Sequence, residues 1–187
     1  MRKNHGFITA SVSFAERRVI NMDFDKASHF WTDKEAGSKV APDAKDRLEK
    51  FIEKHKVCAL ATGAGGYVRC TPIEYNFIDG MVYLFSEGGM KFKGLKDNKN
   101  VCLAIFDAGY KVGFGELHSA QISGAAEIVE PFSEEYLKLL QYKHIPEEMI
   151  RKMPEPMHLI KITPVEADFL DTDFKKDGYD ARQKVVF

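Results

Sequence analysis

The sequence predicts a small, largely antiparallel β-barrel with α-helical additions. Short apolar or alternating runs recur from residue 57 onward, as expected for strands that are buried on one or both faces. Asp79-Gly80 lies between two such runs, and an Asp-Gly pair in this setting is the strongest short-range signal for a β-hairpin. Amphipathic helix patterns occur at the start of the chain and in one late insertion, so helices are expected beside the barrel rather than between its strands.

Each predicted element has a local signal. Residues 23–36 place apolar side chains at helical spacing after Asp23, and a second helix is expected over 43–55. The predicted strands are 57–62, 67–78, 81–86, 100–106 and 120–130, followed by 158–163 and 165–170 on either side of Pro164. A turn is expected over 63–66, an amphipathic helix over 133–144, and a short helix between Pro146 and Pro154.

The chain length and charge limit the class of protein. The chain has 187 residues, with 27 Lys and Arg against 28 Asp and Glu, for a net charge of −1. This balance predicts no nucleic-acid partner and no membrane surface held by bulk charge, and no apolar run is long enough to span a membrane. Residues 1–21 are expected to be an N-terminal extension, either disordered or absent from the natural product, and residues 22–187 a single domain.

The cysteines and histidines predict neither disulfides nor a metal site. Cys58, Cys70 and Cys102 are an odd number without Cys-x-x-Cys spacing, and each lies in a strand-like run. They are interpreted as small core residues of a protein from a reducing compartment, which predicts a cytoplasmic location. The six histidines show no metal-binding spacing, so no metal is expected.

The stretch LFSEGGMKFKGLKDN at 84–98 predicts an anion site. Lysines at the start of a helix oppose its dipole unless an anion offsets them. If Asp79-Gly80 is a two-residue loop, Ile73 pairs with Ser86, and Arg69, Thr71 and Ser86 share one face of the hairpin just before Lys91. A guanidinium, an ammonium, hydroxyls and free amides are the groups that bind a phosphate monoester. The alternative is an ordinary solvated turn.

The order of these motifs resembles the pyridoxamine 5′-phosphate oxidase-like FMN-binding split barrels. The resemblance covers about residues 45–170. It rests on Leu60-Ala61-Thr62, on Arg69-Cys70-Thr71-Pro72, on Ser86 with Lys91, on the run 98–103, and on Gly124-Ala125-Ala126-Glu127-Ile128-Val129.

The resemblance implies a six-stranded antiparallel split barrel that forms a homodimer and binds FMN between the protomers. It assigns the phosphate to Arg69 and Lys91. The remaining cofactor-binding residues that it implies are Cys70, Thr71, Pro72, Ser86, Glu87 and Gln121. The implied function is that of an FMN-dependent oxidoreductase, in which a nicotinamide or another donor reduces FMN and electrons pass to an unknown small-molecule acceptor.

Two departures from the family pattern argue against vitamin B6 oxidation. Met90 stands where many members carry a further basic residue, and the tail from 169 lacks the arginine- and histidine-bearing segment that holds the substrate's phosphate. Three alternatives to an FMN enzyme stay open: a haem-binding branch, with His118 or His158 as the axial ligand, a deazaflavin-binding branch, and a non-catalytic flavin-binding protein associated with stress. No catalytic residue is assigned. His118 and Tyr75 are candidates for shaping the flavin pocket, set against packing roles, and Tyr179 and Arg182 of the tail are candidates for approaching the flavin.

Overall fold

The structure, a computed structural model, describes residues 22–35, 37–107 and 117–187. It divides into two compact units, Met1–Gly37 and Ser38–Phe187. The described part of the first unit is helix α1 (Phe24–Glu35), which begins where the Asp23 carboxylate accepts a hydrogen bond from Lys26 N at 2.9 Å. The predicted extension 1–21 lies outside the described residues, and the extent of the barrel domain stays a prediction.

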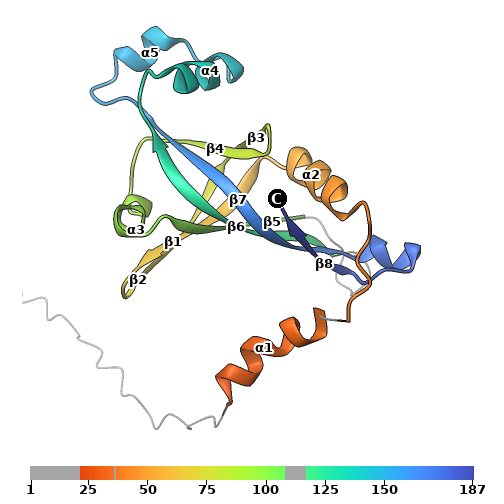
Figure 1. The fold of residues 1–187 in the computed structure, drawn as a ribbon. Coiled ribbons are helices and arrows are strands. Elements are labelled where there is room, and N and C mark those ends of the chain that lie inside the picture. The colour runs from red at the N-terminus through yellow and green to blue at the C-terminus, as the bar shows by residue number, and fades with distance from the viewer. Residues whose placement is uncertain (1–21, 36, 108–116) are drawn as a thin grey trace, which may run out of the picture. The chain divides into compact units, whose positions relative to one another are not determined.

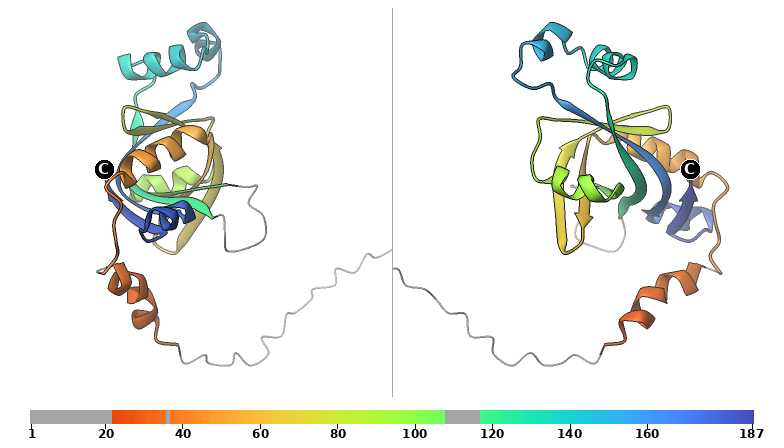
Figure 2. Two further views of the ribbon diagram at one scale, coloured as in Figure 1. Left: turned by 90° about the vertical axis from the view of Figure 1, so that its right-hand side faces the viewer. Right: turned by 60° about the vertical axis from the view of Figure 1, so that its left-hand side comes forward.

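The second unit is built on one curled antiparallel sheet (Figures 1 and 2). Its strands run in the order β2-β1-β5-β6-β7-β4-β3, and β8 pairs with β7. Their bounds are β1 Val57–Ala64, β2 Tyr67–Glu74, β3 Asn76–Ile78, β4 Met81–Ser86, β5 Asn100–Phe106, β6 His118–Val129, β7 His158–Asp171 and β8 Arg182–Val186. The predicted split barrel is confirmed, with eight strands instead of six.

The predicted hairpin forms only around its turn. Ile78 pairs with Met81 as predicted, but the ladder ends at Asn76. Tyr75 breaks the strand, because its ring is buried and its hydroxyl donates to Ile52 O at 2.6 Å. The preceding strand β2 then pairs with β1, so the partner of Ile73 is Cys58 and the predicted pairing with Ser86 is wrong.

The two strands predicted on either side of Pro164 are one continuous strand, β7. Proline cannot donate to a ladder, and the structure accommodates it with a register shift between Ser123 and Gly124 of β6. A Cβ on Gly124 would lie 2.6 Å from Thr163 O, so this close approach requires glycine.

Helices α2 and α3 close the barrel unit. Helix α2 (Ala44–Lys54) lies across one opening of the curled sheet (Figure 2) and buries Leu48 and Ile52 completely in the main core. Helix α3 (Lys91–Asp97) packs on β1, where a Cβ on Gly94 would lie 2.9 Å from Gly63 N. The close approach of α3 to β1 therefore depends on Gly94.

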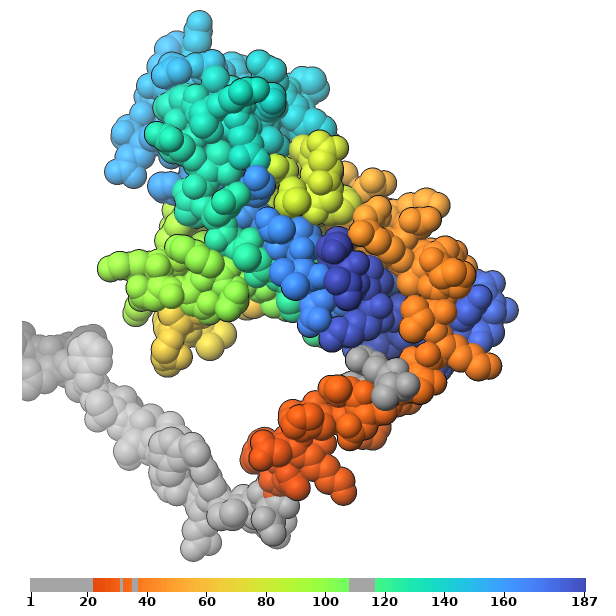
Figure 3. Space-filling model, viewed as in Figure 1, coloured from red at the N-terminus to blue at the C-terminus, as the bar shows by residue number. Residues whose placement is uncertain are grey.

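A second hydrophobic cluster lies beyond the ends of β6 and β7, where α4 (Glu134–Tyr142) and α5 (Glu147–Arg151) form a lobe (Figure 3). Ser133 caps α4, because its Oγ accepts a hydrogen bond from Tyr136 N at 3.3 Å. None of the described helices has the length and apolar composition to cross a membrane.

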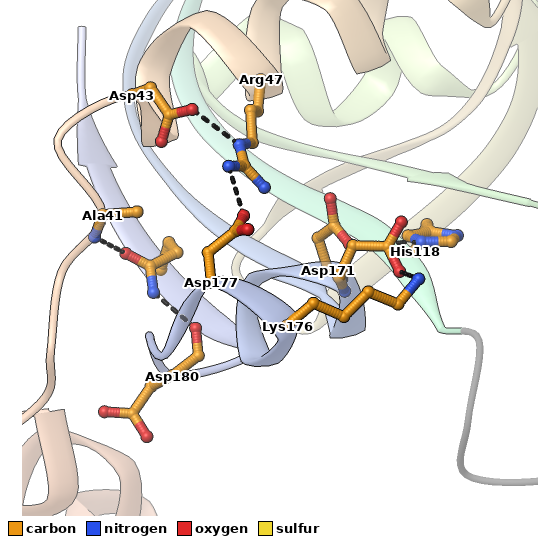
Figure 4. Close-up of polar contacts among 10 residues, drawn as sticks. Ala41, Asp43, Arg47, His118, Asp171, Lys176, Asp177 and Asp180 are labelled. Carbon is orange, nitrogen blue, oxygen red and sulfur yellow. Dashed lines mark hydrogen bonds and ion pairs between the residues drawn. The ribbon is translucent and has the colours of Figure 1, made fainter.

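The C-terminal tail folds back onto the barrel as the 3₁₀ helix η1 (Thr172–Asp177) and strand β8. Arg47 of α2 binds Asp43 at 2.8 Å and Asp177 of η1 at 2.6 Å (Figure 4). Buried Gln183 accepts a hydrogen bond from Ala41 N at 2.8 Å. The tail is therefore part of the sheet, although no strand was predicted there.

Candidate functional site

The loop between β4 and α3 holds a buried lysine. Gly88 and Gly89 have φ angles of 139° and 102°, which favour glycine, and they turn the chain directly into α3. The side chain of Lys91 folds back under this turn and is only 6% exposed. Its Nζ donates to Gly88 O at 2.5 Å. An ammonium group is thus held at the point where the sequence predicts an anion site.

The charges at this point are unbalanced. Burial lowers the pKa of Lys91, and the positive charge of Arg69 lowers that pKa further. Among the residues that the structure describes, neither cation forms an ion pair with a carboxylate. Two neighbouring cations without a counter-charge are unfavourable, so this arrangement favours binding an anion.

Ser86 and Thr62 add hydroxyl groups. Ser86 is 8% exposed, and its Oγ accepts a hydrogen bond from Gly88 N at 3.2 Å, which fixes the glycine turn. Thr62 is opposite Arg69 in the ladder between β1 and β2. Its buried Oγ1 has no hydrogen-bond partner among the described residues. The predictions above omitted Thr62 from the site, although it belongs to the Leu60-Ala61-Thr62 motif.

The predicted residues of β2 divide between the two faces of the sheet. Arg69 and Thr71 pair with the inward-facing residues Thr62 and Leu60, whereas Cys70 pairs with Ala61 on the outer face. Pro72 follows Cys70 at an outward position. Glu87 is exposed between Ser86 and the glycine turn.

Gln121 also lies on the outer face, away from Arg69 and Lys91. It pairs with Ala104 and Asp168 and is exposed. A shallow groove of about 510 Å³ crosses this face, lined in part by Ala61 and Cys102. The predicted residues therefore form an inner set around Lys91 and an outer set that includes Gln121.

His158 and Tyr67 contact residues next to Lys91. His158 is opposite Ser86 in the ladder between β4 and β7, and its ring lies 4.8 Å from that of Phe92. The Tyr67 hydroxyl donates to Met90 O at 3.0 Å and thus ties β2 to the start of α3. The sequence signal for these contacts was weak, because they join residues from separate strands.

Comparison with known proteins identifies the family. The family model described as pyridoxamine 5′-phosphate oxidase matches residues 44–171. The chain belongs to this family. A search of curated proteins found no match.

Solved structures share the fold. ChuZ of Campylobacter jejuni aligns with a TM-score of 0.60 and 19% identity, covering 88% of this chain and 69% of ChuZ. HutZ, a haem storage protein of Vibrio cholerae, aligns with a TM-score of 0.52 and 17% identity, covering 64% of this chain and 88% of HutZ. An FAD-binding protein of Mesorhizobium loti aligns with a TM-score of 0.53 and 20% identity, covering 70% of this chain and 95% of that protein.

In this pyridoxamine 5′-phosphate oxidase-like chain, the two candidates for shaping the flavin pocket, Tyr75 and His118, both contact other residues of the barrel unit. Tyr75 is buried in the core, and burial raises the pKa of its hydroxyl. His118 lies between two carboxylates, with Nδ1 3.4 Å from Asp107 and Nε2 3.2 Å from Asp171. Tyr179 packs against the main core and Arg182 lies in β8, so the tail contributes to the barrel of its own chain.

The three cysteines have different environments. Burial raises the pKa of Cys58 to about 12. Burial also raises the pKa of Cys102, which is partly buried, whereas Cys70 is exposed on the outer face. The interpretation of all three as core residues is therefore wrong for Cys70, because β2 is an edge strand and its outward positions are not covered within this chain.

Proposed function

We propose that this protein is an oxidoreductase that binds FMN as its cofactor. The observation that carries the proposal is the buried Lys91 ammonium beside Arg69, with no carboxylate paired to either among the described residues. The phosphate of FMN supplies the missing negative charge. It would also restore the pKa of Lys91, because an anion stabilises the protonated amine.

The residues present fit a phosphate-bearing cofactor. Arg69 offers a planar donor pair and Lys91 a point charge, while Ser86 and the unpartnered Thr62 offer hydroxyls. Thr71 and Glu87 would contact the rest of the cofactor on the side of Lys91, and Cys70 and Pro72 would contact it on the outer face of the edge strand β2. Bound FMN would supply the redox chemistry between a nicotinamide or other donor and a small-molecule acceptor.

The test of this proposal is retention of FMN by Arg69→Ala/Lys91→Ala. Each charge-assisted contact contributes about 1.5–3 kcal/mol, so we expect the double variant to bind FMN at least about a hundredfold more weakly. Lys93→Ala is the matched control, because Lys93 is exposed on the same helix. Flavin absorbance of the purified protein and fluorescence titration of the stripped protein give the measurement. Unchanged affinity in the double variant would falsify the assignment of the phosphate site.

Catalysis is tested separately from binding. If the protein is an enzyme, the FMN-loaded chain oxidises a nicotinamide donor, and adding an acceptor increases the rate. A chain that retains FMN but shows no donor oxidation is the non-catalytic flavin-binding alternative. A chain that rejects FMN but takes up a deazaflavin belongs to the deazaflavin branch.

The same proposal includes a homodimer formed through the outer face of the sheet. Val68, Phe106 and Val165 are 80%, 57% and 55% exposed, and all three project from this sheet. Val68 and Val165 line the same groove as Ala61 and Cys102. A second copy of the chain would cover this apolar surface and bring Gln121 near the cofactor.

Haem is the second candidate cofactor, and His158 favours it. Within the described part of the chain, the His158 imidazole contacts the Phe92 ring and forms no hydrogen bond, so its nitrogens are available as ligands. HutZ, which shares the fold, is a haem storage protein. Haem uptake would give a sharp Soret band that His158→Ala abolishes, whereas FMN gives two broad bands that this substitution leaves in place.

A further inference from the structure

A histidine and two aspartates meet where β6 begins and β7 ends. His118 is the first residue of β6 and pairs with Asp171, the last residue of β7. Asp173 follows in η1. One nitrogen or oxygen atom from each of these three side chains lies within 4.8 Å of the other two. The ladder and the short 3₁₀ helix thus hold three potential ligand atoms close together, at the opposite end of β7 from His158, which pairs with Ser86.

The His118 ring has a carboxylate at each of its two nitrogens. Its Nε2 lies 3.2 Å from Asp171, and its Nδ1 lies 3.4 Å from Asp107. Asp107 is in turn fixed by His55, whose Nε2 lies 2.7 Å from it. A ring that donates its Nδ1 proton to Asp107 has the Nε2 lone pair available to a metal ion that Asp171 also binds.

We propose that His118, Asp171 and Asp173 bind a divalent transition-metal ion. One imidazole and two carboxylates suit ions such as Zn²⁺ and Mn²⁺, whereas Ca²⁺ prefers six to eight oxygen ligands. A metal-binding histidine usually donates its other ring N–H to a carboxylate or carbonyl that orients the ring, and Asp107 is placed to accept this hydrogen bond from His118. The ion ties η1 to the sheet and has no part in the redox function proposed above.

Lys176 competes for this site. Its Nζ lies 2.6 Å from Asp173, and Figure 4 shows its side chain extending toward His118 and Asp171. A metal ion that binds Asp173 must share this carboxylate with the ammonium or displace it. Removing the Lys176 charge therefore strengthens metal binding, whereas a site occupied only by a proton on His118 gains no metal affinity from the same change.

The sequence does not reveal this site. His118 and Asp171 are far apart in the chain, and no short motif joins them. They meet because β6 and β7 pair along their whole length, which brings the first residue of one strand beside the last residue of the other.

The test is Mn²⁺ titration of the full chain after treatment with EDTA and dialysis, with free Mn²⁺ measured by electron paramagnetic resonance. Mn²⁺ is the probe because it prefers oxygen and nitrogen ligands to the thiols of Cys70 and Cys102. We expect one Mn²⁺ per chain, displaced by Zn²⁺. Asp173→Asn and His118→Ala should weaken binding by at least about tenfold, and Lys176→Gln should strengthen it.

The controls separate metal binding from misfolding. Asp168→Asn is the matched substitution on β7, and it should leave Mn²⁺ affinity unchanged. Asp173 is 48% exposed, so Asp173→Asn is expected to fold, which circular dichroism verifies. No Mn²⁺ binding in the original chain, or equal binding in the original chain, Asp173→Asn and Lys176→Gln, overturns the proposal and leaves a protonated His118 between its carboxylates. Either result is independent of FMN binding, which these variants should retain.

Discussion

At the residue scale, burial separates Lys91 from the other lysines of α3. Lys91 is 6% exposed, whereas Lys93 and Lys96 are exposed. The Lys93 ammonium lies 4.7 Å from the centre of the Tyr67 ring and stays in solvent. Of the three cations in this helix, only Lys91 has lost its hydration, and so only Lys91 gains strongly from a bound anion.

Gly94 determines how closely α3 approaches β1, and its replacement is the first prediction. A Cβ at this position would lie 2.9 Å from Gly63 N and 3.2 Å from Thr62 C. Both neighbours are backbone atoms of a paired strand and cannot move aside. We expect Gly94→Ala to lower the free energy of unfolding by about 1–3 kcal/mol, as measured by denaturant unfolding, and to weaken FMN binding because Lys91 moves with the helix.

Gly66→Ala is the control for this prediction. Nothing lies within 4 Å of a Cβ at Gly66, and its φ is not positive. Its unfolding free energy should stay within about 0.5 kcal/mol of that of the original chain. Equal stability of the two variants would show that α3 does not need the close approach.

At the element scale, the sequence predicted the strands better than their partners. The turn at Asp79-Gly80 was predictable because two residues determine its geometry. The break at Tyr75 was not, because it depends on a hydrogen bond to Ile52 in a helix more than twenty residues away. Lys91 and Arg69 were predicted as partners through an extended hairpin, of which only the part next to the turn forms. They nevertheless lie close together, because α3 packs beside β1 and β2.

Helix α4 is held to the sheet by a polar network, and this network predicts a pH dependence. Glu135 accepts a hydrogen bond from Tyr83 at 2.8 Å and lies 3.0 Å from Lys161. The hydrogen bond with Lys161 and then that with Tyr83 lower the pKa of Glu135 below its usual 4.5. A carboxyl group with a lowered pKa in the folded state stabilises the protein above pH 4.5, and this stabilisation is lost as the pH falls through the folded-state value.

Glu135→Gln should therefore flatten the loss of stability on acidification. Thermal unfolding between about pH 3 and 6 measures the slope, which is set by the difference in protons bound by the two states. Glu134→Gln is the control, because Glu134 is 84% exposed and pairs with Lys138 on its own helix. If both variants keep the slope of the original chain, the network contributes nothing to the acid sensitivity of α4.

At the scale of the whole molecule, the outer face of the sheet is the surface that one chain leaves uncovered. Along β1 and β5, buried residues alternate with more exposed ones, and several of the exposed residues are also apolar. Apolar residues on both faces of a strand do not show from the sequence which face is covered within the chain. The exposure of Val68, Phe106 and Val165 becomes evident only in the folded chain. A stable interface needs at least about 1,000 Å² of buried surface, and the proposed homodimer would bury this face against a second copy.

The homodimer is tested by placing a charge on this face. Val68 is 80% exposed in the single chain, so Val68→Asp should leave the fold intact while opposing burial against a partner. We expect the original chain to sediment as a dimer and Val68→Asp as a monomer, and FMN retention to fall because Gln121 would lose its place at the interface. Met149→Asp on α5, where Met149 is 51% exposed, is the control and should remain dimeric. A monomeric original chain, or a dimeric Val68→Asp variant, contradicts the outer face as the interface.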